Sequence, residues 1–287
     1  MRLATIQTAA GARAAVQLGD TFVDLHATDP AVPASVRQIL AGGKAALQAA
    51  QEAARRGNAV KIEALQAKLL PPIPDPPKIV CLGLNYRDHA IEGGAPIPKD
   101  PVLFSKYATS LIGQGEAIVL PAVSHEVDYE AELVIVVGKK GRHLTRESAA
   151  GHIAGYTIGH DVSARDWQLK KDGRQWMVGK TFDTFAPLGP ELVTADEVGD
   201  PHGLAIKLRL NGQTMQDSHT RHMIFSTAEV VAYLSQVFTV QPGDLVFTGT
   251  PSGVGFTRKP PVFLKGGDVV EVEIENLGVL RNPVVQG

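Results

Sequence analysis

The pattern of apolar and polar residues divides the chain into two parts. Residues 1–25 contain short apolar stretches separated by Gly11 and by "LGDT", a pattern typical of a small sheet of two or three strands. Residues 34–69 are rich in Ala, Leu, Gln, Glu, Lys and Arg and are interrupted by glycines, so they predict two or three helices. Five prolines follow between residues 71 and 77, where neither a helix nor a central strand can continue.

The second part of the chain has a different pattern. Short stretches rich in Val and Ile alternate with Gly, Pro and Asp turns, and helices are expected around residues 145–153 and 226–237. We therefore predict an α+β protein that is mostly β. A small N-terminal α/β domain would occupy residues 1–72, and a larger domain would occupy residues 73–287.

One strand of the larger domain carries an unusual number of acids. The stretch from Glu126 to Val137 reads "EVDYEAELVIVV". Side chains alternate between the two faces of a strand, so Asp128, Glu130 and Glu132 would share one face. Neighbouring like charges repel one another, and water, a basic partner or a bound cation has to offset that repulsion.

A fourth acid, Asp161, follows a second apolar strand in "AGYTIGHDVSARDWQ". Hard cations such as Mg²⁺, Mn²⁺ and Ca²⁺ prefer oxygen ligands, and carboxylates from two neighbouring strands would suit Mg²⁺. A solvated acidic strand face is the commoner explanation of alternating acids taken alone. The pattern therefore leaves both interpretations open.

Two further segments carry residues suited to catalysis. In "GLNYRDHAIEGG", His89 and Glu92 would share a helix face, where a carboxylate can orient an imidazole and raise its basicity. A surface histidine beside an acid is the alternative. The glycines and prolines that follow predict a mobile lid. Lys180 is a lone cation between apolar residues, and a partly buried lysine needs an anionic partner or a substrate.

A glycine-rich stretch, "TGTPSGVG", covers residues 248–255. Its glycines let backbone amides approach a ligand, and Thr250 and Ser252 offer hydroxyls, so an anion could bind there. The stretch lacks the Lys-Ser/Thr of a P-loop and the spacing of a dinucleotide fold, which argues against a nucleotide. A tight turn between strands is the alternative.

Composition narrows the classes of partner and location. The 287-residue chain is 44% apolar with a formal net charge of −2, which gives no electrostatic reason to expect nucleic acid. No apolar run reaches the ~20 residues that a membrane-spanning helix needs, so no membrane partner is expected. The single cysteine, Cys81, excludes an internal disulfide and indicates a reducing compartment, from which we predict a cytoplasmic location.

Several segments, in one order and with one spacing, resemble the fumarylacetoacetate hydrolase family over about residues 73–287. They are "GLNYRDHAIE", "DYEAELVIVVGKKGRHL", "GYTIGHDVSARDWQ", "GKTFDTFAPLGPELVT", "QPGDLVFTGTPSGVG" and "FLKGGDVVEVEIENLG". The resemblance implies a mixed β-roll or sandwich fold for the larger domain and a homodimer in solution.

The resemblance also implies a metal site. Mg²⁺ or Mn²⁺, with Ca²⁺ as a substitute in vitro, would be held by Glu130, Glu132 and Asp161. Asp128 is not among the ligands that the resemblance implies.

The remaining candidates would act on a small 2-oxo acid substrate. By resemblance, His89 and Glu92 would activate water or move a proton. Gln168 and Lys180 would contact the reacting oxygens, and Thr250 would hold a substrate carboxylate.

The activity implied by the resemblance is metal-dependent chemistry on a 2-oxo or 2,4-dioxo acid through an enolate that the cation stabilises. Hydrolytic carbon–carbon cleavage of an acylpyruvate and keto–enol tautomerisation of oxaloacetate both pass through an enolate, and both stay open. An isomerase or decarboxylase of aromatic or sugar-acid catabolism is an alternative. A catalytically inactive, metal-containing binding protein is another.

Overall fold

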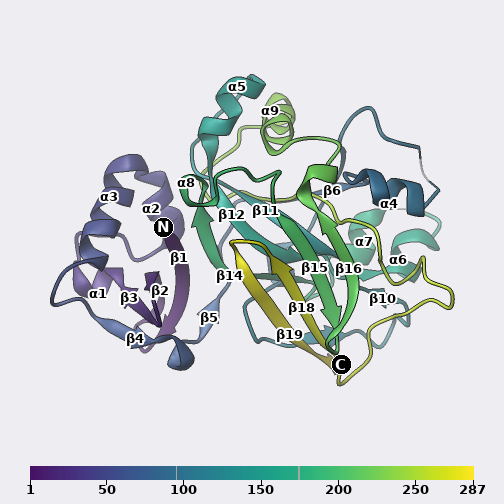
Figure 1. The fold of residues 1–287 in the computed structure, drawn as a ribbon, viewed down its shortest axis with the longest axis horizontal. Helices are drawn as coiled ribbons and strands as arrows, with labels where there is room; N and C mark the ends of the chain where they lie inside the picture. Colours follow the sequence, from purple (N-terminus) through teal and green to yellow (C-terminus); the bar gives the residue numbers. More distant parts are fainter. Residues whose placement is uncertain (95, 174) are drawn as a thin grey trace.

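The computed structural model describes residues 1–94, 96–173 and 175–287, and Figure 1 shows a small N-terminal lobe beside a larger, β-rich body. The lobe contains β1 (Arg2–Thr8), β2 (Gly11–Leu18), β3 (Thr21–Asp24), α1 (Leu25–Thr28), α2 (Val36–Ala41), α3 (Gly43–Ala54), β4 (Lys61–Glu63), the 3₁₀ turn η1 (Ala64–Gln66) and β5 (Leu69–Leu70). The strands predicted for residues 1–25 are confirmed.

The helical prediction for residues 34–69 is only half right. Helices α2 and α3 form there, but the chain then returns to the sheet as β4, which pairs with β3 through Phe22 and Ile62. Strand pairing at a sheet edge overrides the helical propensity of this composition, because propensity contributes only tenths of a kcal/mol per residue.

The larger body begins after the proline-rich segment. Its first half contains β6 (Ile79–Gly83), α4 (Arg87–Glu92), β7 (Val102–Ser105), η2 (Ala108–Ser110), β8 (Leu111–Ile112), β9 (Ile118–Leu120), β10 (Val127–Asp128), β11 (Ala131–Val137), α5 (Arg146–Ala149), η3 (Ala150–His152), β12 (Ile153–His160), β13 (Ser163–Ala164), α6 (Arg165–Leu169) and α7 (Trp176–Lys180). Its second half contains β14 (Ala186–Thr194), α8 (Ala195–Val198), β15 (Ala205–Leu210), β16 (Gln213–His219), η4 (Thr220–His222), α9 (Thr227–Val237), β17 (Leu245–Phe247), β18 (Val269–Ile274) and β19 (Gly278–Gln286).

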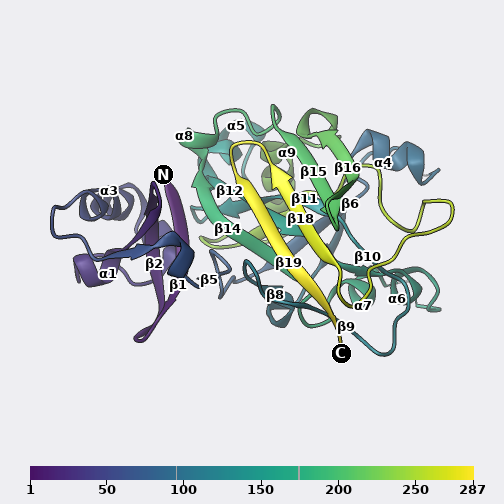
Figure 2. The ribbon, with the colours of Figure 1, turned by 60° about the horizontal axis from the view of Figure 1, so that its bottom comes forward.

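Two sheets account for most of these strands. The larger has the order β4-β3-β2-β1-β14-β12-β11-β17-β6-β7, and the smaller has the order β16-β15-β18-β19-β9. Figures 1 and 2 show the smaller sheet across the face of β11, β12 and β14, and β15, β18 and β19 contact those strands. A mixed, mostly β architecture is therefore confirmed.

The large sheet runs through both lobes. Strand β1 of the N-terminal lobe pairs with β14, with Arg2 opposite Val193 and Leu3 opposite Leu192. The core beneath it is shared as well, because Leu3 and Ile39 belong to the same buried cluster as Val134. The division at residue 72 stays a prediction about how the two parts fold.

Strand β11 explains how the site is anchored. Its Leu133, Ile135 and Val137 face the core between the two sheets, whereas Val134 and Val136 face the core shared with the N-terminal lobe. A strand buried on both faces is uniformly apolar, and this accounts for the "LVIVV" run. Acids at the start of such a strand are therefore held on a rigid base.

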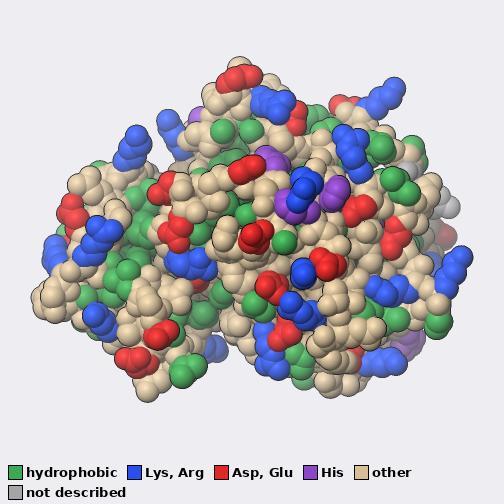
Figure 3. Space-filling model, viewed as in Figure 1, with side chains coloured by type: hydrophobic (Ala, Val, Ile, Leu, Met, Phe, Trp, Pro, Cys, Tyr) green, Lys and Arg blue, Asp and Glu red, His purple; other side chains and the backbone are tan. Residues whose placement is uncertain are grey.

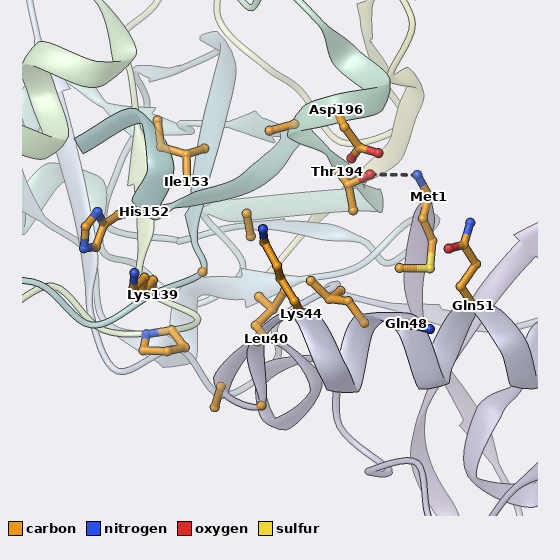
Figure 4. Close-up of a pocket in the computed structure, with 18 of the residues that line it drawn as sticks. Met1, Leu40, Lys44, Gln48, Gln51, Lys139, His152, Ile153, Thr194 and Asp196 are labelled. Carbon is orange, nitrogen blue, oxygen red and sulfur yellow. Dashed lines mark hydrogen bonds between the residues drawn. The ribbon is translucent and has the colours of Figure 1, made fainter. Parts of the chain in front are cut away.

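The outer surface carries both signs of charge. Figure 3 shows acidic and basic side chains interspersed over one face of the molecule. Within the described ranges, no helix combines the length and the apolar character that crossing a bilayer requires. A groove of about 1230 Å³ separates the lobes, and Figure 4 shows Lys44 on its N-terminal wall, facing Lys139 and His152 on the opposite wall. None of the predicted site residues lines this groove.

Candidate active site

Three of the four predicted acids meet at one point. Strand β11 pairs with β12 in antiparallel register, with Ala131 opposite His160, so the start of one strand lies beside the end of the other. The backbone amide of Asp161 donates to the Glu130 carbonyl over 2.9 Å, which fixes this junction. One oxygen from each of Glu130, Glu132 and Asp161 lies within 4.8 Å of the other two.

The strand prediction for these acids needs a correction. Asp128 ends β10 and Glu132 lies in β11, but residues 129–130 belong to neither strand. The interruption separates Asp128 from the other three acids. Its carboxylate instead accepts a hydrogen bond from the guanidinium of Arg165.

The acidic cluster is buried, and the negative charge of its carboxylates is only partly neutralised by neighbouring groups. Glu132 and Asp161 are fully buried. Glu132 Oε2 accepts from the Gly249 amide over 2.8 Å, but Glu132 Oε1 has no hydrogen-bond partner among the described residues. Burial, together with the charges of Asp161 and Glu130, raises the pKa of Glu132 well above its ordinary value. A buried carboxylate oxygen without a partner, beside two more carboxylates, fits a divalent cation with oxygen ligands.

Lys180 bridges two of the acids. Its ammonium donates to Glu130 Oε2 over 2.7 Å and to Asp161 Oδ2 over 2.8 Å. Burial by itself raises the pKa of Glu130, but the charges of Lys180 and Arg165 outweigh burial and hold that pKa far below its ordinary range. Glu130 is therefore ionised at neutral pH, which a metal ligand requires.

A second buried lysine, Lys106, was missed by the sequence analysis. Its ammonium donates to the carbonyls of Val162, Phe185 and Lys180, the first two over 3.2 and 2.8 Å. The same nitrogen lies 2.7 Å from Asp161 Oδ1, where it pairs charges without hydrogen-bond geometry. The signal in the sequence was weak, because β7 before Lys106 is a partly exposed edge strand and its "VLFS" run does not by itself indicate a buried lysine.

Arg165 links Asp128 to the cluster. Its guanidinium donates to Asp128 Oδ2 over 2.8 Å, to Glu130 Oε1 over 2.6 Å and to Gln168 Oε1 over 2.8 Å. It also lies 4.3 Å from the centre of the Phe256 ring. Arg165 was likewise not predicted, and it orients one acid of the cluster and one predicted substrate-binding residue.

The predicted base and its carboxylate lie on α4. His89 Nδ1 is 3.4 Å from Glu92 Oε2, and His89 is nine-tenths buried. His89 lies close enough to Glu130 for its charge to lower the pKa of that carboxyl. Burial raises the pKa of Glu92, but hydrogen bonds from His89 and from the Gly253 amide reverse this and lower it. The dyad and the acidic cluster meet the same loop, because the amides of Gly253 and Gly249 hold Glu92 and Glu132.

The glycine-rich stretch binds carboxylates of the protein itself. The amides of Gly249, Gly253 and Gly255 donate to Glu132, Glu92 and Asp128, respectively. Gly249 and Gly253 have φ values of +94° and +101°, which other residues rarely adopt. This one loop thus holds Glu132 of the acidic cluster, Glu92 of the dyad and Asp128, the partner of Arg165.

Thr250 lies buried in the same loop. Its Oγ1 accepts from Gln216 Nε2 over 2.8 Å, and Gln216 also accepts from the Ala131 amide. The hydroxyl proton of Thr250 is therefore directed away from Gln216.

Comparison with known proteins places the chain among enzymes. The profile of the fumarylacetoacetate (FAA) hydrolase C-terminal family matches residues 78–285. The mitochondrial oxaloacetate tautomerase of Xenopus laevis is 50% identical over 270 residues, covering 94% of this chain and 84% of that protein. A mitochondrial oxaloacetate tautomerase of Homo sapiens is 50% identical over 270 residues, covering 93% of this chain and 85% of that protein.

Solved structures are similar over the whole chain. A putative HpcE protein from Mycobacterium smegmatis is 37% identical with a TM-score of 0.89, and 100% of both chains is covered. Maleylpyruvate hydrolase from Sphingobium, solved in complex with manganese(II) ion and pyruvate, is 34% identical with a TM-score of 0.81, again over 100% of both chains.

The predicted cytoplasmic location is wrong by this comparison, because the Xenopus and human relatives are named as mitochondrial. The physical reason is that a single cysteine indicates only a reducing compartment. It does not distinguish one such compartment from another.

Proposed function

This chain belongs to the fumarylacetoacetate hydrolase family, and from that premise we propose that it interconverts the keto and enol forms of oxaloacetate. It is an enzyme, and its relatives and structural neighbours include an oxaloacetate tautomerase, a maleylpyruvate hydrolase and a 5-carboxymethyl-2-hydroxymuconate delta-isomerase. The observation that carries the proposal is the junction of β11 and β12, where three buried carboxylates share a glycine-rich loop with a histidine–glutamate dyad.

The metal would be held by Glu130, Glu132 and Asp161. A divalent cation there would supply positive charge for the oxygen that becomes negative in the enolate. We propose Mg²⁺ or Mn²⁺, since a manganese(II) ion is present in the maleylpyruvate hydrolase structure and both ions favour carboxylate oxygens.

His89 is the proposed base. Its Nδ1 faces Glu92, so Nε2 is the nitrogen available to the substrate. In enolisation, Nε2 removes a proton from the carbon between the two carbonyl-bearing groups of oxaloacetate. The electron pair of that C–H bond forms the carbon–carbon double bond, and the keto oxygen takes up a proton. The reverse sequence regenerates the keto form.

Three other side chains would bind the substrate. Thr250 accepts from Gln216, so its own proton is free to donate to a carboxylate. Gln168 accepts from Arg165, which leaves its amide N–H groups free for a substrate oxygen. The buried ammonium of Lys180 adds positive charge near the developing enolate.

Hydrolytic cleavage of an acylpyruvate-type substrate is the second candidate. It is favoured by the likeness to maleylpyruvate hydrolase, which is 33–34% identical over the whole chain. It requires His89 to activate a water molecule rather than to deprotonate carbon. Tautomerisation is preferred because the relatives at 50% identity are named for it.

The test follows the ultraviolet absorbance of enol-oxaloacetate. Metal-loaded enzyme should accelerate its decay above a protein-free control containing the same metal, since the free ion also promotes enolisation. EDTA-treated enzyme should lose this activity. His89→Ala should lose it too, whereas His125→Ala, which changes an exposed histidine, should retain it. Equal rates with and without EDTA would refute the metal-dependent mechanism.

A panel of substrates separates the two candidates. Oxaloacetate and an acylpyruvate are assayed with the same enzyme preparation, and pyruvate release is measured for the second. If the enzyme releases pyruvate from the acylpyruvate but does not change the decay of the oxaloacetate enol band, the proposed activity becomes that of a hydrolase instead of a tautomerase. Catalysed rates in His89→Ala that equal those of wild type on both substrates would exclude His89 as the base, whereas wild type without activity on either substrate would favour a metal-containing binding protein.

We also propose that the enzyme is a homodimer, as the family resemblance implies. Apolar side chains near the site, including Tyr107 and Val123, are more than half exposed, and a second copy could cover them. Light scattering during gel filtration would give the mass. A monomer at micromolar concentration would refute the dimer.

A further inference from the structure

Helix α4 carries His89, yet little within the helix itself fixes its position. It is six residues long, Arg87–Glu92, and its N-cap residue Tyr86 makes no side-chain capping hydrogen bond. Helices this short are not stable alone in water. Ile91 on its outer side is 73% exposed, so burial secures only one face. Contacts with other elements must therefore position the helix.

Asp88 supplies two of those contacts and one hydrogen bond within the helix. Its Oδ1 accepts from the backbone amide of His89 over 2.9 Å. Its Oδ2 accepts from the hydroxyl of Ser218 over 2.8 Å and from the hydroxyl of Ser252 over 3.2 Å. One carboxylate thus joins α4 to β16 and to the glycine-rich loop.

Glu92 supports the same attachment from the other end of the helix. It lies four residues after Asp88, on the same face, and accepts from the Gly253 amide over 3.0 Å. Asp88 and Glu92 therefore bind neighbouring residues of one loop, with His89 between them. That loop also carries Gly249, whose amide holds the metal-site acid Glu132.

We propose that Asp88 is a positioning residue, which sets the distance between the base His89 and the acidic cluster by fastening α4 to Ser218 and Ser252. The inference rests on the proposed function, because it gives the attachment a catalytic purpose. Asp88 does not belong to the cluster or to the predicted substrate-binding set. Charge-assisted hydrogen bonds are suited to this task, since they are stronger and more directional than neutral ones.

The chemistry of the contacts predicts an order among substitutions. All three partners donate, and an ionised aspartate is an acceptor only. In Asp88→Asn the side-chain amide would keep one oxygen for the His89 amide and would turn an NH₂ group toward the two hydroxyls, which can rotate to accept. Asp88→Asn should therefore retain part of the function that Asp88→Ala loses.

The experiment compares four variants of the whole chain described here with wild type. They are Asp88→Ala, Asp88→Asn, the double variant Ser218→Ala/Ser252→Ala, and Asp100→Ala as a control. Asp100 is an exposed acid of the neighbouring loop and makes no hydrogen bond or ion pair within the described ranges. Hydrogen exchange of residues 86–92, kcat and KM for oxaloacetate, and Mn²⁺ affinity are measured for each.

In Asp88→Ala we expect the amide hydrogens of α4 to exchange at least about 10-fold faster than in wild type. We also expect kcat to fall by roughly 10- to 100-fold, because a small misplacement of a catalytic group slows the reaction strongly. KM and Mn²⁺ affinity should change by less than about threefold, since neither the metal ligands nor Thr250 is altered. The double serine variant should show the same effects, more weakly, and Asp100→Ala should match wild type.

If the hydrogen-exchange rates of the α4 amides equal those of wild type in both Asp88→Ala and the double serine variant, the proposal is overturned. A rise in KM with kcat preserved would also overturn it and would make Asp88 a substrate-binding residue. Loss of Mn²⁺ affinity in Asp88→Ala would mean that its fold is disturbed, and the double serine variant, which leaves α4 intact, would then decide. Absence of tautomerase activity in wild type would refute the proposed function, whereas the exchange measurements would still test the attachment.

Discussion

At the scale of single residues, the site is a balance of buried charges. Glu130, Glu132 and Asp161 meet Lys180, Lys106 and Arg165 in a buried volume. Each ammonium or guanidinium is directed at Glu130 or Asp161, and none donates to Glu132 in the described part of the chain. Glu132 is therefore the acid whose ionisation depends most on a cation.

We expect metal-free enzyme to lose stability as the pH rises. The folded-state pKa of Glu132 is raised by burial and by Asp161 and Glu130, so its contribution to stability is complete below the unfolded pKa. That contribution is lost as pH rises through the folded pKa, and each pH unit between the two pKa values corresponds to about 1.4 kcal/mol. Melting temperatures in EDTA between pH 5 and 8 would measure the slope.

Glu132→Gln provides the matched comparison. The amide oxygen can still accept from the Gly249 amide, but the group no longer ionises. Its metal-free melting temperature should vary less with pH than that of wild type and should exceed it at pH 8. Mn²⁺ should stabilise wild type and not the variant. A steeper pH dependence in the variant would assign the slope to other groups.

Lys106 should be essential for stability. Lys106→Met keeps an unbranched side chain only one atom shorter, but it removes the donor from three carbonyls and the charge beside Asp161. Breaking a buried ion pair from one side costs about 3–5 kcal/mol, so the free energy of unfolding should fall by about that amount. Urea denaturation would measure it. Lys140→Met, at an exposed position, serves as the control, and a similar small loss in both variants would contradict this assignment.

At the scale of elements, close packing of two short helices positions Lys180. A methyl group on Gly179 of α7 would lie 2.5 Å from the Gln168 nitrogen and 2.7 Å from the Ala164 carbonyl oxygen. Both are backbone atoms, which cannot rotate away. Glycine at this position therefore lets α7 approach α6 and brings Lys180 to the acids.

Gly179→Ala should push α7 away from the site. Overpacking of this kind costs about 1–3 kcal/mol, and kcat should fall because Lys180 and Gln168 lie on the two displaced helices. Gly151→Ala is the control, since nothing lies within 4 Å of a methyl group there. Equal melting temperatures and equal kcat in the two variants would refute the packing argument.

At the scale of the whole molecule, the N-terminal lobe is an extension of the large sheet. Arg2 of β1 donates to Glu191 Oε2 over 2.6 Å, and it also donates to the carbonyls of Asn276 and Leu277 over 2.9 and 2.7 Å. A single side chain thereby joins β1, β14 and the turn between β18 and β19. The two lobes are coupled through backbone pairing and through this ion pair.

Arg2→Ala should weaken that coupling in a pH-dependent way. Glu191 is buried, with the Gln17 amide as a neutral neighbour, and burial raises its pKa even against the opposing charge of Arg2. Without Arg2 the pKa rises further, so more stability is lost as pH increases. We expect a deficit of about 2 kcal/mol at pH 8 that shrinks toward pH 5. Urea denaturation at the two pH values would check it, and a deficit that grows on acidification would contradict the assigned sign.

The sequence alone predicted much of the local structure and which acids lie together. Uniformly apolar runs predicted β11 and its neighbours, the proline-rich segment marked the change from helical to strand-rich composition, and the ordered motifs singled out Glu130, Glu132 and Asp161, which the fold brings together. These features depend on short-range periodicity or on motif order, which a one-dimensional pattern contains. The fold class and the family were predictable for this reason.

Only the tertiary structure decided which charges are paired. Asp128 alternates with Glu130 and Glu132 in the sequence, yet Arg165 and the amides of Gly255 and Phe256 hold it apart from the cluster. The three carbonyls that accept from Lys106 lie 56, 74 and 79 residues away along the chain. Such pairs form only when folding brings distant segments of the chain into one buried volume, where an unpaired charge costs several kcal/mol. A local sequence pattern does not specify that volume, and so the pairing of each acid with lysine, arginine or backbone amides is decided only in the folded chain.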